Sequence, residues 1–132
     1  MPKNPMYGQN KSDALSGSAF VTVGLTGMGS SGNRYCVCPM DGARVSSMSF
    51  VATTAVTSAA SAILVKDGAG DTIGTGTVPV LAQYAGALVA QGLEKDADSA
   101  LNAGDVIEIE FDGASGAGAG DMVVQFVQAV GY

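Results

Sequence analysis

The amino-acid sequence predicts an all-β protein, an antiparallel β-sandwich or jelly roll of about eight strands. Short runs of apolar and β-branched residues recur along the chain, and turn signals rich in Gly, Asp and Pro separate them about every ten residues. In the clearest run, Ile107, Ile109 and Phe111 fall on one face of an extended strand. Glu108 and Glu110 fall on the opposite face, which is typical of a strand with one buried and one solvated side.

The pattern predicts strands over residues 19–25, 34–38, 43–52, 61–66, 72–80, 87–91, 105–111 and 122–130. Pro39 ends the second strand, because proline cannot donate to a sheet ladder. The fourth and fifth strands flank the Gly-rich loop 67–71, which predicts a β-hairpin. Another Gly-rich run, 112–120, is expected to be a loop before the last strand.

Two stretches leave alternatives open. Residues 53–60, rich in Thr and Ala, fit either a loop or a frayed strand end. Residues 81–93 place several apolar side chains at helical spacing, so a helical turn is the alternative to the short strand at 87–91. Gly86 and Gly92 favour the strand, since each costs about 1 kcal/mol in a helix interior.

The domain organisation is predicted to be an extended N-terminal arm, residues 1–17, followed by a single β-sandwich domain, residues 18–132. The arm segment has no apolar periodicity, and Pro5, Met6 and Tyr7 are its only apolar anchors. Two interpretations stand: an untethered, disordered leader, or an arm that docks on a neighbouring molecule through those three residues.

Composition limits the classes of partner. The net charge is −6, and the six basic residues are scattered singly along the chain, so we expect neither nucleic-acid binding nor attachment to acidic lipids. No apolar run is long enough to span a membrane or to act as a signal peptide, which predicts a soluble protein made in the cytoplasm. Hydrophobic residues make up 47% of the chain but aromatic residues only 6%, and burial against sister subunits would supplement such a small-residue core.

The sequence predicts no enzyme and no cofactor. It contains no histidine, which removes Ser-His-Asp and Cys-His catalysis. Cys36 and Cys38 are too few for a structural zinc site and are interpreted as buried, unbridged hydrophobic residues. The G-x-G-x-x-G segment 27–32 precedes a strand and not a helix, so it predicts a loop and not a dinucleotide site.

The carboxylates are assigned structural roles. Neither of two aspartate pairs, Asp67 with Asp71 and Asp112 with Asp121, has the spacing of a helix-loop-helix calcium site. Turn and strand-end roles are therefore expected for them. The alternative is a cation bound between subunits. The pair formed by Glu108 and Glu110 could suit a glycosidase, but solvated strand carboxylates explain it better. A histidine-free hydrolase that uses Ser with Lys, or paired carboxylates, is not supported, because no candidate nucleophile has an identifiable base beside it.

The order of segments 41–45, 61–67, 71–78 and 103–109, followed by a Gly/Ala loop and a terminal Val/Phe strand, resembles a known family over residues 19–130. These are the jelly-roll decoration, or cement, proteins on the heads of tailed bacteriophages. The resemblance implies a trimer on the outer surface of the virion capsid that bridges major capsid protein subunits and performs no chemistry. A carbohydrate- or receptor-binding β-sandwich module of a head fibre or tail is the alternative.

Overall fold

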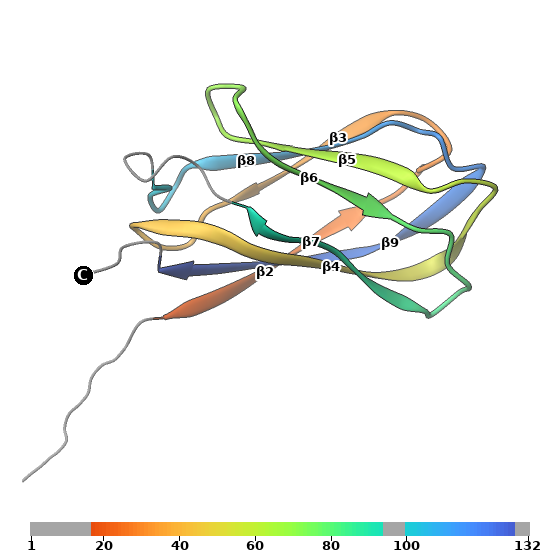
Figure 1. Ribbon diagram of the computed structural model, residues 1–132, viewed down its shortest axis with the longest axis horizontal. Coiled ribbons are helices and arrows are strands. Elements are labelled where there is room, and N and C mark those ends of the chain that lie inside the picture. The colour runs from red at the N-terminus through yellow and green to blue at the C-terminus, as the bar shows by residue number, and fades with distance from the viewer. Residues whose placement is uncertain (1–16, 94–99, 129–132) are drawn as a thin grey trace, which may run out of the picture.

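A computed structural model describes residues 17–93 and 100–128 (Figure 1). Its strands are β2 (Ser18–Leu25), β3 (Gly32–Val37), β4 (Ala43–Thr57), β5 (Ser61–Lys66), β6 (Thr72–Val78), β7 (Gly86–Leu93), β8 (Val106–Phe111) and β9 (Ala117–Gln128). The described part of the chain contains no helix, and therefore none that could cross a membrane. The predicted all-β class is confirmed.

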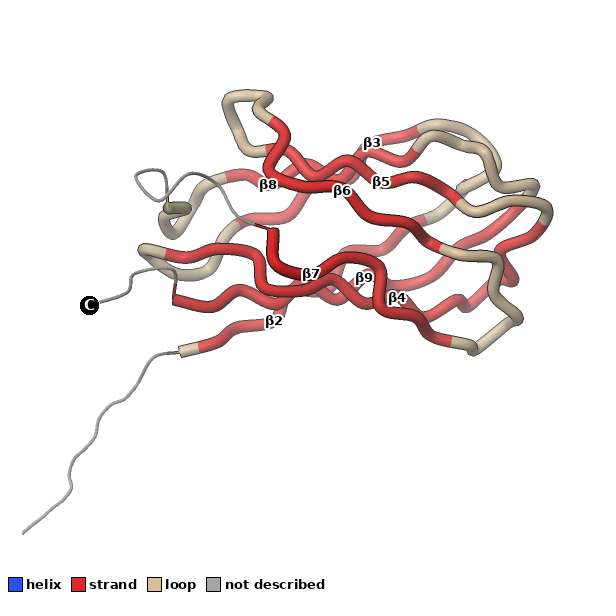
Figure 2. The backbone as a smooth tube through the Cα atoms, in the orientation of Figure 1, coloured by secondary structure: helices blue, strands red, loops and turns tan. Residues whose placement is uncertain are grey.

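The strands form two antiparallel four-stranded sheets that face each other as a sandwich (Figure 2). The first sheet has the order β2-β9-β4-β7 and the second the order β3-β8-β5-β6. The pairings are nested, because β5 pairs with β6, β4 with β7, β3 with β8, and β2 with β9. A long antiparallel ribbon rolled into two sheets in this way is a jelly roll.

The core lies between the sheets and takes one face of every strand. Ile107, Ile109 and Phe111 are buried in it, as their alternation with glutamate predicted. Phe50 and Phe126 supply the other large rings from the first sheet. The remaining buried side chains are small or aliphatic, so the two sheets are held together mainly by Val, Ile, Met and Ala.

Glycine sets how closely the sheets approach along one side of the sandwich. A Cβ added at Gly76 in β6 would lie 2.7 Å from the carbonyl oxygen of Val89 in β7. Real Cβ atoms do not approach a carbonyl so closely, so only glycine lets these two edge strands, one from each sheet, come together.

Two predicted boundaries change. Strand β4 continues to Thr57, so residues 53–57 of the stretch left open are strand. The strand predicted at 87–91 is confirmed as β7, and no helical turn forms there. The prediction of a loop over 112–120 is wrong for residues 117–120, which pair as the first part of β9. Gly118 and Gly120 concealed this strand, because glycine is typical of loops. Both are buried against β4, and Gly120 has no room for a side chain beside the carbonyl oxygen of Val51. The other described boundaries agree to within two residues.

The predicted arm contacts, Pro5, Met6 and Tyr7, lie outside the described residues, as does Val130 at the predicted end of the last strand.

Candidate functional site

The glutamates of β8 lie on the outer face of the second sheet, where each has a neighbouring partner. Asn33 donates a hydrogen bond from Nδ2 to Oε2 of Glu108 at 2.6 Å. Lys66 Nζ lies 3.2 Å from Oε1 of Glu110, across the β5–β8 pair. Both glutamates are half-buried, so they act as cross-strand partners on a solvated sheet face.

Asp67 holds the β5–β6 hairpin. Its Oδ1 accepts hydrogen bonds from the backbone N–H groups of Ala69 and Asp71, both at 2.9 Å. The carboxylate therefore replaces the ladder hydrogen bonds that the turn interrupts, which is the role that Asp has in turns. The sequence grouped Asp67 with Asp71 correctly, but the link runs through the Asp71 backbone.

Asp112 closes β8 in the same manner. Its Oδ1 accepts hydrogen bonds from the backbone N–H groups of Ala114, at 3.0 Å, and Ala62, at 3.2 Å, and from Ser61 Oγ at 3.3 Å. The hydrogen bond from Ala114 is the main reason that the pKa of Asp112 lies below its ordinary value, since these donors favour the charged form. Asp121, which the sequence paired with it, lies on β9 in the other sheet.

The two cysteines are buried, free thiols that belong to the core. Burial raises the pKa of Cys36 to about 11, with Cys38 a smaller cause, and burial also raises the pKa of Cys38. Cys38 Sγ donates a hydrogen bond to the carbonyl of Met40 at 3.2 Å. Both thiols are therefore protonated at neutral pH and serve as small hydrophobic side chains, as predicted.

The G-x-G-x-x-G segment forms a turn into β3. Met28 at its centre is fully buried, and its N–H donates to the carbonyl of Gly118 at 3.1 Å. No helix starts here, so the segment lacks the row of free amides that would bind a pyrophosphate. Over residues 17–93 and 100–128, no three Cys, Asp or Glu side chains gather to form a metal site.

The outer face of the first sheet differs in character from the rest of the surface. The cross-strand register places three rows of side chains on it: Phe20–Gln125–Ser47–Gln91, Thr22–Val123–Ser49–Leu88 and Gly24–Asp121–Val51–Gly86. We call these three rows, with Arg44 at one end, the small-residue face. Arg44 and Asp121 are the only charged residues in the four strands, and they lie at opposite ends of this face.

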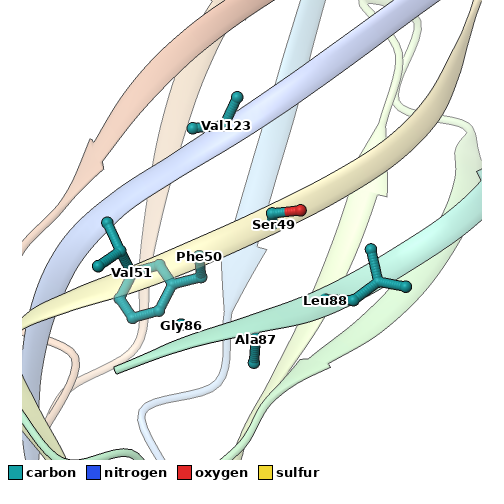
Figure 3. A pocket seen from close by; sticks show the side chains of 7 residues that line it. All are labelled: Ser49, Phe50, Val51, Gly86, Ala87, Leu88 and Val123. Carbon is teal, nitrogen blue, oxygen red and sulfur yellow. The ribbon is translucent and has the colours of Figure 1, made fainter. Parts of the chain in front are cut away.

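A shallow depression of about 440 Å³ lies on the small-residue face (Figure 3). Its lining comes from three adjacent strands: Ser49, Phe50 and Val51 of β4, Gly86, Ala87 and Leu88 of β7, and Val123 of β9. The missing side chain of Gly86 lowers one end, and Leu88, which is 56% exposed, forms the rim. This surface was not predicted from the sequence, although the sequence shows that these four strands carry only two charged residues between them.

No protein-family model matches the chain, and no curated protein or solved structure matches it.

Proposed function

We propose that this chain is a structural virion protein that binds the outer surface of a phage capsid. In this role it bridges major capsid protein subunits and stabilises the shell. The observation that carries the proposal is the nested jelly-roll strand order, an architecture that viral capsid proteins use. The resemblance of residues 19–130 to phage decoration proteins supports it independently of the coordinates.

The roles of the polar side chains also support a binding protein. Asp67 and Asp112 accept backbone hydrogen bonds in turns, and Glu108 and Glu110 are occupied with cross-strand partners. Each of these four carboxylates therefore has a role in the fold. The net charge of −6 favours a protein partner over nucleic acid.

The capsid contact is assigned to the N-terminal arm, with Pro5, Met6 and Tyr7 as its apolar anchors. The arm joins the sandwich at Ser18, an exposed residue at the start of the edge strand β2. From this position the arm is proposed to contact a neighbouring subunit. The assembly on the shell is proposed to be a homo-oligomer, a trimer in the resembling family.

The test uses purified full-length protein and expanded shells of the virus that encodes it. Co-sedimentation should show saturable binding, cryo-EM should place density over the joints between major capsid subunits, and decorated shells should withstand more heating than bare ones. A variant lacking residues 2–17 should keep the β-sheet circular dichroism spectrum and bind at least tenfold more weakly. The triple substitution of Pro5, Met6 and Tyr7 by serine is the matched variant of full length.

No binding to any shell state, or binding that leaves shell stability unchanged, would overturn the proposal. Full binding by the truncated protein would overturn the assignment of the arm alone. The carbohydrate- or receptor-binding alternative predicts a competable hit on a glycan array. The exposed aromatic side chains of the described residues, Phe20, Tyr35 and Tyr84, lie on the first sheet, the second sheet and a loop, so they form no shared sugar platform.

A further inference from the structure

We infer that the small-residue face is the surface through which copies of this chain associate, with Phe20 of one copy inserted into the depression of the next. The inference deepens the proposed function, which requires a homo-oligomer, by assigning the contact that builds it. Three observations lead to a second copy as the occupant: an exposed ring, an apolar depression on the same face, and the charge distribution.

Phe20 is the exposed ring. It lies in the middle of β2 with 65% of its surface exposed, on the small-residue face opposite Gln125. A phenyl ring in water leaves a large apolar area unburied, and aromatic side chains are the usual anchors of protein interfaces. The pairing of β2 with β9 runs without a register shift, so the backbone holds this ring in a fixed position.

The depression suits such a ring. Val51, Leu88 and Val123 line it with apolar groups, and Gly86 leaves room at one end (Figure 3). Phe20 cannot fill it within its own chain: the centre lies between β4 and β7, about 12 Å from β2 at the usual spacing of strands. A Phe20 ring that enters it therefore belongs to another copy of the chain.

A second copy is the proposed occupant, and the charges favour this face for contact between copies. A chain of net charge −6 repels its own copies, and the outer face of the second sheet presents Glu108 and Glu110. The small-residue face presents only Arg44 and Asp121, of opposite sign, six residues apart along β9 or about 20 Å. The two charges sum to zero, so repulsion opposes a contact between copies less here than on the second sheet.

The ring and the depression occupy different places on one face. A copy seated face to face on this surface covers both, so two copies pair and each Phe20 enters the depression of the other. Within each contact the anchor is a single aromatic side chain in a desolvated pocket. That arrangement concentrates the binding energy and makes the inference testable with single substitutions.

The experiment measures mass in solution by light scattering and sedimentation equilibrium. Phe20→Ser removes the ring, and Ser49→Phe fills the depression from its exposed wall. Each should weaken self-association at least ~30-fold, the loss expected for an interface anchor. Tyr35→Ser, at a residue 60% exposed on the second sheet, is the matched control and should leave the oligomer unchanged. Circular dichroism should show all three variants folded, because the positions are exposed.

Mixing the two disabled variants provides the sharper test. The Ser49→Phe variant keeps its Phe20, and the Phe20→Ser variant keeps its depression, so an equimolar mixture should form heterodimers that neither variant forms alone. A monomeric wild-type chain, an unaffected Phe20→Ser oligomer, or a mixture that stays monomeric would overturn the inference. Capsid binding is scored separately, so an oligomer that fails to bind shells would overturn the proposed function and leave this contact standing.

Discussion

Replacing Ile109 by alanine tests the face assignment on which the whole fold depends. Ile109 lies at the centre of β8 with no exposed surface, and its backbone neighbours are Arg34 on β3 and Val65 on β5. Because a strand flanks it on each side, the surrounding backbone has little freedom to collapse into the space left by the missing side chain. The substitution should therefore show close to the full cost of a buried deletion.

The expected loss follows from the atoms removed. Ile109→Ala deletes three buried carbons, worth about 0.8 kcal/mol each in lost transfer free energy, which gives about 2.4 kcal/mol. An incompletely collapsed void of about 50 Å³ adds about 1 kcal/mol. The free energy of unfolding should therefore fall by about 3–4 kcal/mol, which is a large part of the stability of a domain of this size.

Urea unfolding followed by far-ultraviolet circular dichroism measures this loss. With a denaturant slope of about 2 kcal/mol/M, the midpoint should fall by about 1.5–2 M. Both proteins should carry Phe20→Ser, so that self-association does not add concentration-dependent stability. Glu108→Ala, one position away on the solvated face, removes the hydrogen bond with Asn33 and should change stability by less than about 1 kcal/mol. A loss below about 0.5 kcal/mol for Ile109→Ala would mean that the two faces of β8 are reversed.

Two further predictions use the glycine and carboxylate positions. Gly120→Ala should destabilise the fold by about 2 kcal/mol or more in the same urea assay, because its Cβ would overlap the carbonyl oxygen of Val51. Gly24→Ala, with open space around it, is the control and should change stability by less than about 0.5 kcal/mol. Equal effects of the two substitutions would contradict the close approach of β4 and β9. Asp112→Asn should lower the free energy of unfolding at neutral pH. The difference from wild type should shrink as the pH falls below about 4, since a carboxyl with a lowered pKa stabilises the fold only while it is ionised. A difference independent of pH would show that the Ala114 hydrogen bond does not depend on the charge of Asp112.

The sequence predicted the fold wherever side chains alternate, and less well where they are absent. In β8 the alternation of Ile109 with Glu110 identifies both the strand and its buried face. The start of β9 carries no such signal, because Gly118 and Gly120 have no side chain to alternate. Its strand character comes from pairing with β2 and β4, distant segments whose registers local pattern cannot supply.

The candidate interaction surface was beyond the reach of sequence reasoning for a related reason. Phe20, Val123 and Leu88 belong to strands far apart in the chain, and only the strand order β2-β9-β4-β7 places them on one face. In the sequence, Phe20 is not distinguishable from the other apolar residues of its predicted strand. The cross-strand register shows that it stands opposite Gln125, away from the core.

The two outer faces differ in how they meet water. On the second sheet, Lys66 with Glu110 and Asn33 with Glu108 pair across strands, so that face carries its own polar partners. The first sheet carries the uncharged pair of Ser47 and Gln125, in which Ser47 Oγ donates to Gln125 Oε1 at 3.2 Å, and it leaves an exposed phenyl ring on an edge strand. Edge strands usually carry charges, bulges or proline that discourage association, and β2 has none of these over its eight residues. The exposed ring and the unprotected edge therefore both support the contact proposed for β2 and the face beside it.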